Sequence, residues 1–166
     1  MRALADRLDR VNRAVGLAVR WAALLMVLIQ FGTVLLRYVF GVSDIALDES
    51  VLYLHAAFFM LGAGYTLMVD GHVRVDILQA RAPVRMRAGI DLAGHALLLL
   101  PTMALIAYWS WPSVRNAWAI LEGPISVGGI PASFLLKSLI PGFCLLLALQ
   151  GVAGMLRAVE ALRGRA

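Results

Sequence analysis

Charged residues are scarce in this chain of 166 residues: they make up 15% of it, and hydrophobic residues make up 61%. A soluble domain carries about 25% charged residues, because it needs a polar surface to face water. Too few charges remain here to cover a soluble protein of this size. The composition therefore excludes an ordinary soluble domain and indicates a protein whose solvent is mostly lipid.

Cysteine is almost absent, since Cys144 is the only one. It can form no disulfide within the chain and no cysteine-based metal cluster, so we interpret it as a packing residue. His55 and His95 fall within apolar runs, but helices that rise about 1.5 Å per residue put them at different depths. We therefore expect packing histidines and no cofactor, with a haem-binding redox subunit as an alternative.

Four long apolar runs lie at about residues 14–39, 46–69, 90–109 and 132–156. A bilayer core of about 30 Å needs about 20 apolar helical residues. Each run is expected to be a helix, because backbone groups in lipid must be bonded within their own segment. We predict an all-α integral membrane protein, a single domain over residues 1–166 with four transmembrane helices.

The N-terminal segment before the first run carries apolar residues at helical spacing: Leu4, Leu8, Val11 and Val15. This pattern is typical of an interfacial amphipathic helix, and a frayed, solvated tail is the alternative. No small-residue cleavage site follows the first run, so we expect a membrane span and not a cleaved signal peptide.

Lysine is nearly absent too, because 14 of the 15 basic residues are arginine. They lie between apolar runs, which favours lipid headgroups and topology over nucleic acid as their role. Twelve of them fall in the N-terminal segment, the second connection and the C-terminal tail. The three on the other side are Arg37, Arg115 and Lys137. This asymmetry predicts that both termini are cytoplasmic.

No carboxylate lies at the centre of a span, where a carrier coupled to protons or cations would usually need one. Arg37, Glu49 and Lys137 are instead expected at one outer depth. We predict that Arg37 pairs with Glu49 and that Lys137 reaches the headgroups alone; a Glu49–Lys137 pair is the alternative.

The second connection holds the most distinctive pattern, Gly71-His72-Val73-Arg74-Val75-Asp76. We expect Gly71 to end the second span as a left-handed cap, followed by an amphipathic connector at the interface. Gly62 and Gly64 are expected to allow close approach of helices, and Pro101 and Pro141 to kink them. The third connection, rich in glycine and proline, is expected to be a shaped loop.

Three stretches carry a resemblance to a known family. They are Arg37-Tyr38-Val39-Phe40-Gly41 with Glu49-Ser50, the connector from Gly71 to Asp76, and Gly128-Gly129-Ile130-Pro131 with Lys137 to Phe143 and Gln150-Gly151. With four spans and both ends inside, the chain resembles the small membrane subunit of tripartite ATP-independent periplasmic (TRAP) transporters over nearly its whole length.

The resemblance implies a secondary transporter in which a sodium gradient drives uptake of an organic acid or similar solute into a bacterial cell. Its implied partners are a large membrane subunit, a periplasmic solute-binding protein and the lipids of the inner membrane. This chain would then be a scaffold that contacts no solute. Its structural or interface residues would be Arg37, Glu49, Gly71, His72, Arg74, Asp76, Lys137, Pro141 and Gln150. The alternatives are a homodimeric four-helix exporter and a membrane anchor of an unrelated complex.

Overall fold

The computed structural model describes residues 2–72 and 82–164, and every regular element in them is helical. The helices are α1 (Arg2–Val39), α2 (Ile45–Met68), α3 (Val84–Ala93), the π-helical turn η1 (Gly94–Leu99), α4 (Leu100–Ala119) and α5 (Ser133–Leu162). Because α3, η1 and α4 follow one another without a break, the chain has four helices that are long and apolar enough to cross a membrane. The predicted all-α fold with four spans is thereby confirmed.

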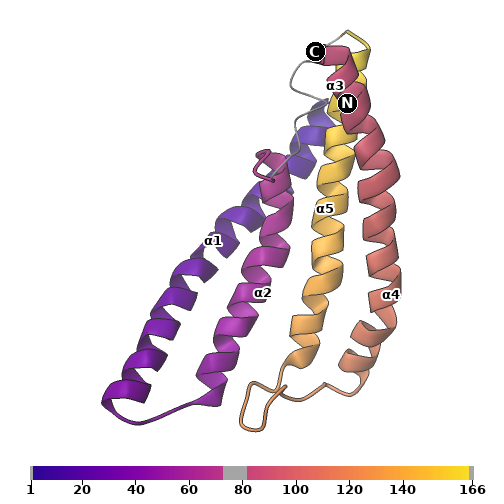
Figure 1. The fold of residues 1–166 in the computed structure, drawn as a ribbon. Coiled ribbons are helices and arrows are strands. Elements are labelled where there is room, and N and C mark those ends of the chain that lie inside the picture. Colours follow the sequence, from indigo (N-terminus) through magenta and orange to yellow (C-terminus); the bar gives the residue numbers. More distant parts are fainter. Residues whose placement is uncertain (1, 73–81, 165–166) are drawn as a thin grey trace.

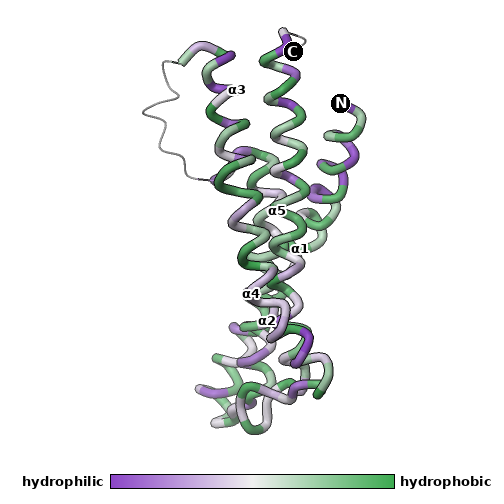
Figure 2. Tube along the Cα trace, turned by 90° about the vertical axis from the view of Figure 1, so that its right-hand side faces the viewer, coloured by the Kyte–Doolittle hydropathy of each residue, from purple (hydrophilic) through white to green (hydrophobic). Residues whose placement is uncertain are grey.

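Over most of their length the four long helices lie side by side in one layer, in the order α1, α2, α5 and α4, and the start of α1 also contacts α5 (Figure 1). Turned by 90°, the molecule is narrow in its middle and spreads at the end that holds α3 and both termini, and its hydrophilic residues gather towards the two ends (Figure 2). Both termini and α3 lie at one end, which we call the terminal end. The opposite loop end holds the connections 40–44 and 120–132.

Helix α1 is a single helix of 38 residues, about 57 Å long, which is nearly twice the thickness of a bilayer core. The N-terminal segment is therefore helical and continuous with the first span, and the alternative of a frayed tail is wrong. The side of this segment that packs within the molecule carries Ala5, Asn12 and Gly16, whereas Leu4 and Val11 are exposed, as lipid-facing residues would be. Small and polar residues thus form the contact face of this segment.

The third span contains a π-helical turn with a cause in its sequence. Pro101 has no backbone N–H, and its ring would collide with the carbonyl of the preceding turn in a regular α-helix. The chain widens just before it, and the Leu100 N–H donates to the carbonyl of His95, five residues earlier. The deformation expected at Pro101 therefore takes the form of a π turn, which carries His95.

Helix α2 ends in a hydrogen-bonded cap, but not at the residue that the sequence suggests. At the end of α2, Asp70 adopts the left-handed conformation (φ 55°), the Gly71 N–H donates to the Thr66 carbonyl and the Asp70 N–H to that of Leu67. These are the two bonds of a Schellman cap. The prediction that Gly71 is the left-handed residue is wrong, since Gly71 takes the next position.

Helix α5 is the central element, because it contacts α1, α2, α3, η1 and α4. A third of its most apolar window is buried, against 6% for each of the other three spans. Cys144 and Leu147 on α5 form the centre of the core with Met103 on α4, as the packing interpretation of Cys144 predicted. The remaining apolar surface faces outward along the layer.

Candidate functional site

A buried carboxylate organises the loop end. Glu49, in the first turns of α2, is 6% exposed, and its two carboxylate oxygens accept the backbone N–H groups of Ser126 (2.9 Å) and Ile130 (2.7 Å). Gly129 lies against the same carboxylate, so closely that a Cβ at this position would collide with it. Both oxygens are thus held by the 120–132 loop, and this glycine makes the approach possible. We call this arrangement the Glu49 clasp.

The ion pairs at the loop end differ from those predicted. Arg37 pairs with Asp48 at 3.0 Å, and Lys137 pairs with Glu122 at 2.6 Å. Both the predicted Arg37–Glu49 pair and the alternative Glu49–Lys137 pair are therefore wrong, as is the prediction that Lys137 reaches the headgroups alone. Glu49 instead accepts backbone N–H groups of the distant loop. The Asp44 side chain caps the start of α2 by accepting from the N–H groups of Ala46 and Leu47.

The terminal end is held by a chain of polar contacts between α1 and α5. Arg157 donates to both oxygens of Asp9 (2.6 and 2.7 Å), and the Gln150 amide donates to Asp9 Oδ1 at 3.1 Å. The Asn12 amide then donates to Gln150 Oε1 at 2.9 Å and to the carbonyl of Leu146 at 3.3 Å. Asn12 is fully buried and Gln150 is 3% exposed. The network therefore fixes the first third of α1 onto α5.

Glycines let the helices meet at this network. A Cβ on Gly64 of α2 would collide with Asn12 Oδ1, and one on Gly16 of α1 would collide with the ring of Tyr65. The close approach predicted for Gly64 is confirmed. Gly62 makes only an ordinary contact, since its Cβ would lie 3.8 Å from Val19 Cγ2. Asn12 Oδ1 lies against Gly64 and has no hydrogen-bond partner in the part of the chain that the structure describes.

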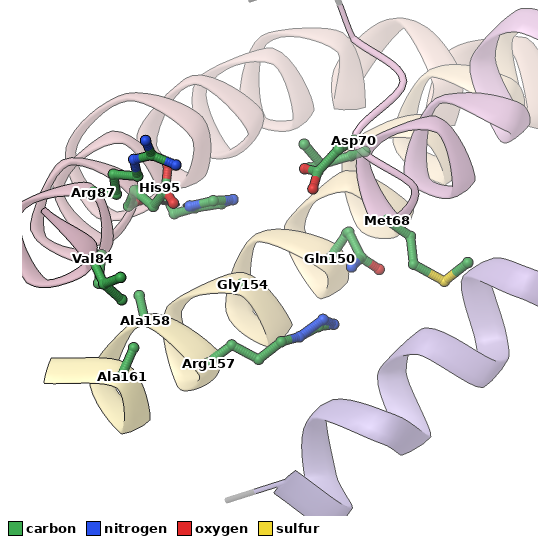
Figure 3. Close-up of a pocket in the computed structure, with 13 residues that line it drawn as sticks. Met68, Asp70, Val84, Arg87, His95, Gln150, Gly154, Arg157, Ala158 and Ala161 are labelled. Carbon is green, nitrogen blue, oxygen red and sulfur yellow. Dashed lines mark hydrogen bonds between the residues drawn. The ribbon is translucent and has the colours of Figure 1, made fainter. Parts of the chain in front are cut away.

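A polar cavity of about 400 Å³ adjoins this network at the terminal end. Its polar lining comes from four elements and consists of Asp70, Arg87, Asp91, His95, Gln150 and Arg157 (Figure 3). His95 Nδ1 is 2.6 Å from the carbonyl of Asp91, and a carbonyl can only accept, so Nδ1 carries the proton. Its Nε2 faces α5, where a Cβ on Gly154 would lie 2.8 Å away.

The structure does not bring His95 and His55 together, because His95 lines the cavity at the terminal end and His55 lies on the outside of α2. His55 is exposed on α2, where its ring contacts Phe59 with centroids 4.6 Å apart. Within residues 2–72 and 82–164, no group of three histidine, cysteine or acidic residues has a geometry suited to a metal ion. The Glu49 clasp joins α2 to the 120–132 loop, and the terminal network joins α1 to α5. Their polar groups are used in these contacts, which favours a structural role over catalysis.

Two uncharged polar residues, Gln30 and His55, stand exposed among apolar side chains on the α1–α2 face. Gln30 lines a shallow hollow of about 420 Å³ with Met26, Phe31, Val34 and Val51. His55 follows Val51 by one helical turn, which puts it on the same side of α2. The other residues that line this hollow are apolar, and Val27 among them is 62% exposed. Polar groups exposed at this depth need a hydrogen-bonding partner outside the chain.

The predicted site residues lie in different places. Arg37, Glu49 and Lys137 all make polar contacts at the loop end, Gln150 belongs to the terminal network, and Pro141 lies half-buried in α5. Gly71 and His72 are exposed after α2, while Arg74 and Asp76 lie outside the described residues. The sequence analysis missed Asp9 and Asn12. The sequence did hold a signal for this contact face: the polar residue Asn12 shares one side of the helix with the small residues Ala5 and Gly16.

Comparison with known proteins decides the family. The model of the tripartite ATP-independent periplasmic transporters, DctQ component, matches residues 26–161, which include the last three spans almost completely. The chain belongs to this family. It is a small permease subunit of the TRAP type and a multi-pass membrane protein, as the resemblance implied.

One curated relative is named as a C4-dicarboxylate TRAP transporter small permease protein DctQ, from Vibrio cholerae serotype O1. It is 28% identical to this TRAP subunit over 97 residues, which cover 56% of this chain and 42% of the relative. The matched part is thus less than half of the relative's length. No solved structure matches the chain.

Proposed function

We propose that this chain binds the large membrane subunit of a TRAP transporter and holds it in the bacterial inner membrane. The observation that carries the proposal is the layer of helices, in which only 6% of the most apolar window of α1, α2 and α3–α4 is fully buried within the chain. A layer one helix thick has two broad faces, and lipid or another subunit must cover them. The two buried polar clusters stiffen this layer at both of its ends.

The α1–α2 face is the side that we assign to the large subunit. Gln30 and His55 are exposed there among apolar side chains, and hydrogen bonds from polar residues join helices in a bilayer. A lipid tail offers neither residue a donor or an acceptor. A protein partner that supplies these groups therefore gains both specificity and affinity at this face.

The orientation follows from charge. The terminal end carries the arginine-rich segments, so we place it in the cytoplasm and the Glu49 clasp at the periplasmic surface. The rigid 120–132 loop would then face the compartment in which a solute-binding protein delivers its cargo. In this scheme the large subunit carries the solute, an organic acid, together with the sodium ions whose gradient drives uptake.

Co-purification tests the proposal. The tagged chain is expressed with the large membrane subunit encoded beside it, extracted in a mild detergent, and analysed for the partner and its stoichiometry. We expect an equimolar complex that takes up solute in liposomes only with a sodium gradient and the binding protein. Recovery of this chain alone, as a homodimer that moves solute by itself, would contradict the proposal and favour a small exporter.

Two matched variants test the assigned face. Val27→Trp adds bulk to the α1–α2 face, and Leu105→Trp adds the same bulk to α4; the two wild-type side chains are 62% and 58% exposed. We expect Val27→Trp to lower the yield of the complex and Leu105→Trp to leave it unchanged. The reverse pattern would move the interface to α4.

A further inference from the structure

A second groove runs between α1 and α2, nearer to the terminal end than the hollow at Gln30. It has a volume of about 350 Å³, and Arg20 is the only charged residue in its lining. The other lining residues are apolar, small or aromatic: Gly16, Leu17, Val19, Phe58, Phe59, Gly62, Tyr65 and Thr66. A groove of this composition suits a hydrocarbon chain, with one cationic group beside it.

Arg20 lies within the membrane-spanning part of α1. Gly16 packs on Tyr65 and Val19 on Gly62, so Arg20 stands opposite the turn of α2 that precedes Gly62. That turn is about seven residues before the end of α2 at Met68, or about 10 Å along the helix. Residues 21–36, between Arg20 and Arg37, carry no charge. The guanidinium therefore belongs to the depth of one leaflet and not to bulk water.

No carboxylate neutralises this guanidinium within residues 2–72 and 82–164. Arg20 is exposed and takes part in none of the ion pairs there; its one contact is a cation–π interaction with Trp21, 5.3 Å from the ring centroid. An unpaired arginine facing lipid is costly, and it is stabilised by a nearby anion. Because helical side chains lean towards the N-terminus, Arg20 reaches towards the headgroups on the terminal side.

We propose that this groove is a binding site for one phospholipid of the leaflet on the terminal side. The guanidinium of Arg20 donates hydrogen bonds to the lipid phosphate, and one acyl chain lies along the groove over Gly62 and against Phe58 and Phe59. Gly62 leaves the floor of the groove open, since nothing but Val19 comes within 4 Å of the position of a Cβ there. Trp21 beside Arg20 fits the headgroup level, where indole rings are enriched.

A phospholipid fits these observations better than a carboxylate of another subunit. A single carboxylate would neutralise Arg20 but leave the elongated apolar groove beside it empty. A phospholipid supplies the anion and the hydrocarbon together in one molecule. The groove lies on the same side of α1 as the hollow at Gln30 but nearer to the terminal end, because Arg20 and Val27 are seven residues apart on that helix. The lipid is therefore placed beside the surface assigned to the large subunit, where Phe59 of the groove contacts the ring of His55.

Native mass spectrometry of the purified full chain tests the proposal. The probe is phosphatidylglycerol, added at rising concentration to the delipidated protein in detergent, and the readout is the fraction of protein with one lipid bound. Arg20→Gln is expected to lower the apparent affinity about tenfold, the order of one lost charge-assisted contact. Arg20→Lys is expected to keep part of it, and Gly62→Leu, which fills the groove, to lower it as well.

The control is Arg13→Gln, which removes an exposed arginine seven residues earlier that does not line the groove. Wild-type affinity is expected for it. Circular dichroism and gel filtration show whether each variant is folded; if Arg20→Gln is not, Gly62→Leu carries the test. Unchanged binding in folded Arg20→Gln or Gly62→Leu would overturn the proposal. Loss of the large subunit with unchanged lipid binding would also overturn it and assign Arg20 to a carboxylate of that partner.

Discussion

The side-chain amides of Asn12 and Gln150 share a hydrogen bond of 2.9 Å across 138 residues of sequence. The bond is buried, and it joins the first third of α1 to the central helix α5. Through Gln150 it continues to Asp9 and Arg157, so a contact inside the layer is linked to an ion pair at its rim. These four side chains at the terminal end are therefore linked in one continuous hydrogen-bond network.

A double-mutant cycle measures this link. Asn12→Leu and Gln150→Leu each leave a buried amide without its partner, so each is expected to lower the thermal stability in detergent. The double variant removes both amides and is expected to lose less than the sum of the two single losses. Hydrogen bonds between membrane helices suggest a coupling of about 0.6 to 1.7 kcal/mol. Simple additivity would show that the bond contributes nothing to stability.

Gly64 is expected to be far less tolerant of substitution than Gly62, although both lie on α2. Gly64→Ala would drive a methyl group into Asn12 Oδ1, and overpacking of this kind costs about 1–3 kcal/mol. Gly62→Ala makes an ordinary contact and is expected to change stability little. Melting temperatures of the two variants in one detergent check the contrast. Equal losses in the two would contradict the close packing of Asn12 on Gly64.

Glu49→Gln is expected to loosen the 120–132 loop without changing the volume of the side chain. The amide offers one acceptor oxygen where the carboxylate offers two, so Ser126 or Ile130 loses its acceptor. The lost bond is a part-buried one to a charged group, and such hydrogen bonds contribute about 1.5–3 kcal/mol. Hydrogen–deuterium exchange should rise at these two amides. Asp48→Asn, on the exposed neighbour, is the control, and its loop amides should exchange at the wild-type rate.

Gly129→Ala and Gly123→Ala form a matched pair within the same loop. A Cβ at Gly129 would collide with the Glu49 carboxylate, whereas nothing lies within 4 Å of one at Gly123. We therefore expect Gly129→Ala to lower the melting temperature and to reproduce the faster exchange of Glu49→Gln. Gly123→Ala is expected to behave as the wild type. A stable, slowly exchanging Gly129→Ala variant would rule out the clasp.

The number of spans and their helical structure could be predicted from the sequence, because a lipid bilayer sets the length and the hydropathy that a spanning segment needs. The 24 residues of α2 begin and end within one residue of the expected bounds. The partners of individual charges could not be predicted in this way. The sequence offers Arg37 two neighbouring carboxylates, Asp48 and Glu49, and the choice between them depends on which one the distant loop binds. That loop lies 77 residues further along the chain.

The cap of α2 and the buried contacts of the N-terminal segment could not be predicted for a related reason. The apolar residues of this segment gave no sign that α5 and α2 would pack against its other side, where Ala5, Asn12 and Gly16 are buried. At the end of α2, the cap required a left-handed residue one position before the available glycine, and Asp70 took it. In both cases the result depended on something that the local sequence pattern does not show: a contact with another helix in one, and a shift of the helix end by one residue in the other.

The layer of helices has a consequence for how this chain can diverge among relatives. A slab has two broad faces, and a single partner can cover only one of them (Figure 2). Positions on the lipid side then need only remain apolar, so they are free to exchange among leucine, valine and isoleucine. Positions that touch the partner must change together with it. Among relatives, the residues on the lipid side of every helix should therefore vary faster than the residues on the partner side.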